Sequence, residues 1–176
     1  VDPDHLLLGN REVAVLTRPE VYVAAAARLD VISVNDYVFI EGVAAGTMSL
    51  SGGLGSEGAL SGPAALVDMP FLISEFGFRA DGGAPPNTWP PVYPTFADQA
   101  ARAAAHAEYV GALQAAPWIV GHHWFEWVDQ PVDGRFDGED NNWGLVDEQD
   151  RVYETLTASM TRVHDSLWAR LRVPAE

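Results

Sequence analysis

Several kinds of residue and motif are absent from this chain, and each absence narrows its chemistry. There is no cysteine, which excludes disulfide bonds and thiol catalysis. There is no lysine, and the ten basic residues, all arginine, are outnumbered by 25 acidic residues, so that the net charge is -15. This balance argues against nucleic acid or an anionic membrane surface as a partner, and it equally fits a solvated surface. No apolar run approaches the roughly 20 residues that a membrane span needs.

Nucleotide-binding motifs and a leader are missing as well. No GxGxxG motif follows the first expected strand, and there is no phosphate loop. The stretch "SGGLGSEG" over 51–58 is rich in glycine but follows no expected strand directly. The chain shows no signal peptide and begins with valine, so we expect it to be processed or cut from a longer polypeptide.

Four short apolar runs, each bounded by turn or polar residues, predict strands. They lack clean alternation, as is typical of strands buried on both faces, and they cover 5–9, 30–34, 70–76 and 118–125. Helical patterns follow them: a helix over 17–29, at most a short helix near 57–66, a helix after 95–98 that ends at 117, and a last helix over about 151–172. Strands that alternate with helices predict a parallel α/β fold.

The expected helices carry recognisable boundary signals. Thr17 and Glu20 have the spacing of a capping box, with Pro19 in the first turn. Thr95 and Asp98 repeat that spacing before the next long helix. In the last helix one apolar stripe predicts a core contact, and its members are Leu156, Met160, Val163, Leu167 and Leu171.

The long loops follow the expected strands rather than precede them. This asymmetry is typical of a (β/α)8 barrel of the TIM type, whose site forms at the carboxyl ends of the strands. Four β/α units are half of a barrel that normally has eight units and about 250 residues. We therefore expect residues 1–176 to form a half barrel. Its open sheet edges and apolar face predict a partner, either a missing N-terminal half barrel or a second copy.

The ends of the expected strands bring polar and aromatic side chains to one rim. They are Asn10, Arg11, Asn35, Tyr37, Glu75, His122, His123, Trp124, Glu126 and Trp127. A pocket with one central carboxylate, amides, a phenol and an indole suits sugar chemistry. An oxocarbenium-like transition state needs a carboxylate under the anomeric carbon, and sugar faces stack on aromatic rings. Loop aromatics, namely Trp89, Tyr93 and Trp143, add to this inventory.

Several motifs resemble those of a known enzyme group. The stretches "DHLLLGNR", "DVISVNDY", "PFLISEFGF" and "HWFEWVDQP…GR…DGE" are similar to retaining glycoside hydrolases of clan A, above all enzymes of the β-agarase type. The resemblance covers Asp4 to about Val163 and implies the C-terminal half of a catalytic (β/α)8 barrel acting on a polysaccharide, without a cofactor or metal. It also favours a secreted or periplasmic location.

The resemblance implies a role for each matching residue. Glu75 would be the nucleophile that forms a glycosyl-enzyme, Tyr37 would hydrogen-bond it, and Trp124 would form the floor of the sugar subsite. Further contacts to sugar hydroxyls would come from Asn35, Glu126, Glu139 and Asn141. In this clan the general acid/base is a Glu that follows an Asn at the end of the fourth strand. This chain has no Asn-Glu pair, so we expect that residue upstream of residue 1.

Other interpretations of these residues stay open. Glu75 also fits a structural carboxylate paired with Arg79. Because neighbouring strand residues face opposite sides, at most one of His122 and His123 lines the pocket while the other packs against a helix, which makes a metal site unlikely. The run "DGEDNN" over 137–142 contains calcium-type ligands but lacks the full EF-hand spacing, so we expect a solvated loop.

Binding contacts at the rim have alternatives too. Trp89 and Tyr93 fit either sugar contact or a role in holding their proline-rich loop. Asn10 and Arg11 fit either sugar contact or capping of the next turn.

Three other functions are compatible with the sequence. The first is a non-catalytic carbohydrate-binding half barrel. The second is a complete small hydrolase that uses Glu75 with Glu126 or Glu139. The third is a metal-dependent hydrolase of another α/β class.

Overall fold

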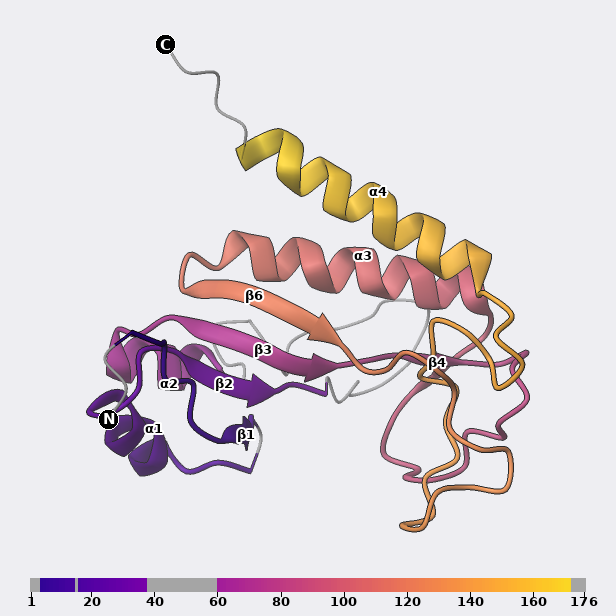
Figure 1. Ribbon diagram of the computed structural model, residues 1–176, viewed down its shortest axis with the longest axis horizontal. Coiled ribbons are helices and arrows are strands. Elements are labelled where there is room, and N and C mark those ends of the chain that lie inside the picture. The colour runs from indigo at the N-terminus through magenta and orange to yellow at the C-terminus, as the bar shows by residue number, and fades with distance from the viewer. Residues whose placement is uncertain (1–3, 15, 38–59, 172–176) are drawn as a thin grey trace. The chain divides into compact units, whose positions relative to one another are not determined.

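The computed structural model describes residues 4–14, 16–37 and 60–171. Contacts divide the chain into two compact units (Figure 1). The first unit comprises 1–77 and 112–125, and the second comprises 78–111 and 126–176. None of the described helices is both long and apolar enough to cross a membrane.

The first unit is built on a parallel sheet. Its strands are β1 (Arg11–Val13), β2 (Ile32–Asn35), β3 (Phe71–Phe76) and β6 (Ile119–Trp124), paired in the order β1-β2-β3-β6. The helices α1 (Pro19–Ala26) and α2 (Ser61–Val67) follow β1 and β2 and lie side by side (Figure 1). The prediction of an α/β fold with a parallel sheet is confirmed.

One face of each middle strand is fully buried, whereas the alternate residues of β3 are half-buried, so the predicted burial on both faces holds only in part. Ile32, Val34, Phe71 and Ile73 have no exposed surface. The ring of Phe71 packs at 6.0 Å from Tyr22 of α1 and at 5.4 Å from Trp118, measured between ring centroids. Residues from both neighbouring elements therefore close over β3.

The first predicted strand, 5–9, is wrong, because the strand begins at Arg11 instead. Leu7 does accept hydrogen bonds from the backbone N–H groups of Asp30 and Val31, yet no ladder follows. Gly9 has a φ of 66°, which lies outside the extended region and turns the chain before it can pair with β2. A Cβ at this position would come within 2.5 Å of a terminal methyl group of Leu29, which would have to move.

Helix boundaries follow the predicted positions with different caps. The capping box at α1 is wrong: Arg18 is the N-cap, and the Thr17 hydroxyl donates to Glu12 Oε2 at 3.2 Å. At α3 (Gln99–Ala115) the Asp98 carboxylate accepts the N–H of Ala101 at 2.8 Å, as an N-cap does. This helix ends before Pro117, as predicted.

The second unit contains a short sheet and a long helix. The strand β4 (Arg79–Ala80) pairs in parallel with β5 (Thr95–Phe96), and α4 spans Glu154–Leu171. The sequence did not predict the short sheet. Leu156 and Met160 of the predicted stripe are buried, whereas Val163 and Leu167 are half-buried and the side chain of Leu171 lies outside the described residues.

A buried arginine holds the second unit together. Arg102 donates to the carbonyl oxygens of Phe78 at 2.6 Å and Gly144 at 3.0 Å, and its guanidinium lies 5.4 Å from the centre of the Tyr153 ring. Burial lowers the pKa of Arg102 to about 10, an effect that the negative charge of Asp129 opposes. The side chain therefore remains charged at neutral pH and joins segments far apart in the sequence.

Candidate active site

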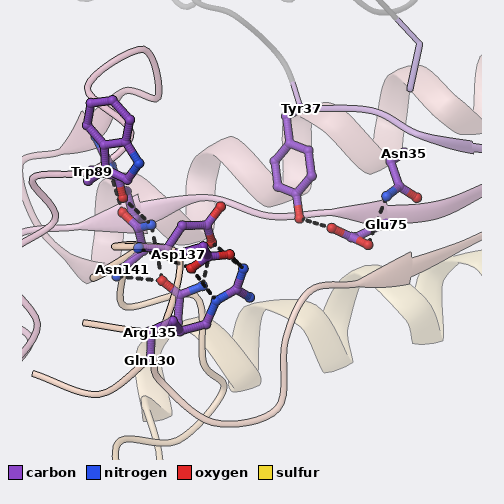
Figure 2. A network of polar contacts seen from close by, with 10 residues as sticks. Asn35, Tyr37, Glu75, Trp89, Gln130, Arg135, Asp137 and Asn141 are labelled. Atoms are coloured by element: carbon purple, nitrogen blue, oxygen red, sulfur yellow. Dashed lines mark hydrogen bonds and ion pairs between the residues drawn. The ribbon is translucent and has the colours of Figure 1, made fainter. Parts of the chain in front are cut away.

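Three hydrogen-bond donors converge on Glu75 near the end of β3. Arg11 Nη1 lies 2.8 Å from Glu75 Oε2, and Asn35 Nδ2 lies 2.9 Å from the same oxygen. The Tyr37 hydroxyl donates a short hydrogen bond to Oε1 (Figure 2). All three groups only donate here, which matches an ionised carboxylate that can only accept. The structure thus brings together four of the residues expected at the rim, Arg11, Asn35, Tyr37 and Glu75, and gives Arg11 a partner that neither sugar contact nor turn capping anticipated.

The register of the parallel strands explains this convergence. Asn35 on β2 pairs with Glu75 on β3, after a register shift between Val34 and Asn35. Such a bulge redirects side chains. Here Ser74 Oγ also reaches Asn35 and donates to its Oδ1 at 3.0 Å. With its carbonyl oxygen bonded to Ser74, the Asn35 amide must turn its N–H groups toward Glu75.

The alternative pairing of Glu75 with Arg79 is wrong. Glu75 forms its ion pair with Arg11, whereas Arg79 donates to Asn141 Oδ1 and to the Tyr93 carbonyl oxygen. Glu75 is largely covered, with 14% of its side chain exposed, while 59% of the Arg11 side chain is exposed. The sequence signal for Arg11 was its place at the end of the first apolar run, but nothing in it indicated a partner two strands away.

The end of β6 brings aromatic rings beside β3. Trp124 pairs with Phe76, and their rings pack edge to face at 5.4 Å between centroids. His122 packs on the same ring at 5.6 Å, and Phe125 packs against Tyr37 at 6.4 Å. The sequence analysis missed Phe125, which supports the phenol that contacts Glu75.

Two further residues of the first unit, Asn10 and His123, are exposed to solvent. Asn10 is exposed, one residue before β1. His123 is exposed rather than packed, so the expectation that it covers a helix is wrong. Within the described residues no group of three or more His, Asp or Glu side chains is arranged to hold a metal ion.

The second unit contains another polar network, which organises a loop. Asp140 Oδ1 accepts the backbone N–H groups of Thr88 at 2.7 Å and Trp89 at 2.8 Å. Asn141 Nδ2 donates to the Trp89 carbonyl oxygen at 2.8 Å (Figure 2). Burial alone would raise the pKa of Asp140, but the hydrogen bonds from Thr88 and Trp89 outweigh it and lower that pKa.

This network corrects two expectations about 137–142. The segment is not a solvated loop throughout, because Asp140, Asn141 and Asn142 are buried. Asn141 is not available to sugar hydroxyls, because Arg79, Trp89 and Gln130 bond its amide group. A run of Asp and Asn in the sequence cannot distinguish side chains that face water from side chains that bond the backbone of a neighbouring loop.

The aromatic loop residues divide into one exposed and two packed rings. The backbone of Trp89 is held by Asp140 and Asn141, while the residue is 53% exposed. Tyr93 packs on Trp143 at 5.5 Å between ring centroids, and Trp143 is buried. Trp143 therefore belongs to the core of the second unit, and Trp89 keeps a face that a ligand can reach.

Glu126 lines a pocket of about 350 Å3 in the second unit. The other lining residues are Val128, Asp129, Gln130, Pro131, Arg135 and Glu148. Glu126 Oε1 is buried without a hydrogen-bond partner, and burial raises the pKa of Glu126, partly offset by the positive charge of Arg135. Glu139 accepts a hydrogen bond from Gln130 at 2.7 Å and lies 3.4 Å from Arg135. An unpartnered acceptor such as Glu126 Oε1 suits a ligand hydroxyl.

Comparison with known proteins relates this chain to β-agarases. The chain is 34% identical over 157 residues to β-agarase A and 30% identical over 167 residues to β-agarase B, both from Vibrio sp. strain JT0107. These matches cover 88% and 94% of this chain but only 14% and 16% of the relatives. No protein-family model matches the sequence.

A solved structure of an agarase also resembles this chain. An exo-β-agarase superposes with a TM-score of 0.76 at 31% identity, over 94% of this chain and 20% of that one. The chain is therefore homologous to β-agarases and corresponds to a small part of them, and its parallel sheet matches part of a glycoside hydrolase fold.

Proposed function

We propose that this chain supplies the nucleophile of a retaining glycoside hydrolase that cleaves an agarose-like polysaccharide. The observation that carries the proposal is the carboxylate of Glu75, held by Arg11, Asn35 and Tyr37 at the carboxyl ends of parallel strands. Carboxylates at the carboxyl ends of the strands of a β/α barrel are typically catalytic. The homologous proteins are β-agarases, which also supports the proposal.

Hydrolysis would proceed in two displacements. A Glu75 oxygen bonds to the anomeric carbon as the glycosidic C–O bond breaks, and the general acid protonates the departing oxygen. Water then bonds to the same carbon, loses a proton to the general base, and releases Glu75 as a carboxylate. The acid/base Glu is proposed to lie upstream of residue 1, about 5–5.5 Å from Glu75 in the assembled enzyme.

The other predicted site residues are proposed to bind sugar. Trp124 offers a ring beside β3 for stacking, with His122 on the same face of β6, and Asn10 precedes β1. From the second unit, Trp89 offers an exposed ring, and Glu126 and Glu139 offer carboxylates. Residues 1–176 would then be the C-terminal half of the (β/α)8 catalytic barrel. Its other half would come from an upstream segment or a second copy.

The decisive test is Glu75→Gln in the full-length protein, assayed on agarose. We expect kcat to fall by several orders of magnitude while the Kd for agarose oligosaccharides changes by less than about three-fold, because the amide keeps the shape but cannot act as a nucleophile. Glu108→Gln, at an exposed position of α3, is the matched control. Near-normal turnover by Glu75→Gln would refute the assignment.

A non-catalytic carbohydrate-binding protein is the second candidate. The exposed rings of Trp89 and Trp127 favour it, because such rings bind sugar without any acid/base. It predicts that agarose oligosaccharides raise the melting temperature of the full-length wild type although no hydrolysis occurs.

A further inference from the structure

The two oxygens of Glu75 are held unequally. Oε2 accepts from both Arg11 at 2.8 Å and Asn35 at 2.9 Å, whereas Oε1 accepts from the Tyr37 hydroxyl. A carboxylate oxygen has two lone-pair directions, and those of Oε2 are both engaged. Oε1 therefore keeps a direction free for a new bond, so it is the oxygen placed to attack, and Oε2 becomes the ester carbonyl oxygen that faces Arg11.

Arg11 is poorly placed to contribute to the stability of the fold. Its side chain is 59% exposed, and it reaches Glu75 from β1, across β2. An exposed ion pair of this kind adds little to folding free energy. The same contact matters more for chemistry, because it is the one full positive charge among the three donors described around Glu75.

The charge of Arg11 acts oppositely on the two displacements. Before the first step Glu75 is an anion, and the attraction to Arg11 stabilises that ground state. In the glycosyl-enzyme the carboxylate has become a neutral ester, so the attraction is weaker. When water attacks, the C–Oε1 bond breaks, its electron pair returns to the carboxylate, and the proton of water goes to the general base. The attraction to Arg11 grows during this second step, so it favours breakdown.

We propose that Arg11 is a positioning residue that speeds breakdown of the glycosyl-enzyme by holding Glu75 Oε2. The inference rests on the proposed function, because it needs a covalent intermediate on Glu75. In this role Arg11 affects the rate of turnover, whereas the sequence suggested that it contacts sugar or caps the next turn.

The test compares Arg11→Met with wild type in the full-length enzyme on agarose oligosaccharides. Losing one charge-assisted hydrogen bond in the second step should lower kcat about ten-fold. Because kcat/KM reports the first step, in which Arg11 stabilises the ground-state carboxylate, it should not fall and should rise by up to about ten-fold, so KM falls more than kcat. Rapid quenching should show a burst of first product and a glycosyl-enzyme detectable by intact mass. Guanidinium ion should restore part of kcat.

Controls separate this role from a structural one. Arg28→Met removes another exposed arginine of the first unit and should leave all parameters unchanged. Arg11→Lys keeps the charge without the guanidinium geometry and should fall between Arg11→Met and wild type, which also preserves the test if Arg11→Met folds poorly. Equal losses in kcat and kcat/KM without a burst, or no loss at all, would overturn the inference.

Failure of the proposed function has a different signature. Wild type would then form no covalent adduct with an activated fluoro-sugar, or Glu75→Gln would retain turnover. An adduct on Glu75 combined with parallel losses in Arg11→Met would reject the role of Arg11 alone.

Discussion

The polar networks around Glu75 and around Asp140 are each centred on a carboxylate, but the two carboxylates accept hydrogen bonds from different kinds of donor. Three side chains, those of Arg11, Asn35 and Tyr37, donate to the Glu75 carboxylate. Asp140 instead accepts two backbone N–H groups, those of Thr88 and Trp89. Side-chain donors orient a carboxylate without building any loop, whereas backbone donors tie the carboxylate to the loop whose N–H groups it satisfies.

The difference predicts opposite responses to mutation. Removing a partner of Glu75 should impair turnover and leave the stability of the fold nearly unchanged. The Arg11 side chain is 59% exposed, so water can replace a lost hydrogen bond at this end of the site. Removing the acceptor of the Asp140 network should lower stability, because two part-buried N–H groups lose their hydrogen bonds and the loop that they hold is released.

The largest effect is expected from Asp140→Ala, which removes the acceptor of two N–H groups in the second unit. The free energy of unfolding should fall by about 2–4 kcal/mol in urea titration. Asp133→Ala, on the exposed part of the same region, is the control and should change little.

Acid should reduce the difference in unfolding free energy between wild type and a variant that lacks the Asp140 carboxylate. Because hydrogen bonding lowers the pKa of folded Asp140, its contribution is present above the unfolded Asp range near pH 4 and is lost as pH falls through the folded pKa. A stability difference between wild type and Asp140→Asn that did not shrink as the pH falls below about 4 would contradict this assignment.

A smaller effect is expected from Tyr37→Phe, which removes the donor to Glu75 Oε1. Loss of a hydrogen bond to a charged group should lower kcat about 10- to 100-fold with a shift in melting temperature of less than about 2 °C. Tyr22→Phe, in the same unit but packed on Phe71, controls for loss of a hydroxyl. If Tyr37→Phe instead unfolded the protein without affecting the activity of the folded fraction, the contrast between the two networks would fail.

The smallest effect is expected at Glu126, where burial raises the pKa. A raised folded pKa means that stability is complete below the unfolded Glu value near pH 4.3 and is lost as pH rises through the folded pKa. Glu126→Gln should therefore stabilise the protein by less than about 1 kcal/mol at pH 8 and by nothing at pH 4. Melting curves at both values measure it, with Glu154→Gln on α4 as the control. Equal shifts at pH 4 and pH 8 would rule out ionisation as the cause.

Several elements of both units could be predicted from local patterns. The apolar run before Glu75 specified a buried strand, and the spacing of apolar residues specified α4 with Leu156 and Met160 inside. Alternation of strands and helices specified parallel pairing, because a helix between two strands returns the chain to the same end of the sheet. Glu75, Asn35 and Tyr37 followed as neighbours because each stands at the end of a strand.

The wrong predictions share a physical cause. The strand over 5–9 failed because Gly9 adopts a positive φ, and the capping box failed because Thr17 bonds Glu12 instead. The interpretation of Asn141 failed because Arg79 and Trp89, 62 and 52 residues away, bond its side chain. In each case a short apolar or polar pattern allowed more than one conformation or partner, and for Asn141 residues distant in the sequence selected one.

The sequence by itself determined β2, β3 and β6, the long helices and the carboxylate at the centre of the candidate site, because hydrophobic periodicity and strand ends are local properties. Only the tertiary structure decided which donors reach that carboxylate and which polar residues are used to build loops. The pairing of Asn35 with Glu75 depends on a register shift between two strands, and Arg11 reaches Oε2 from a third. Such contacts depend on distances of a few ångströms between segments far apart in the chain, and no spacing within one segment encodes them.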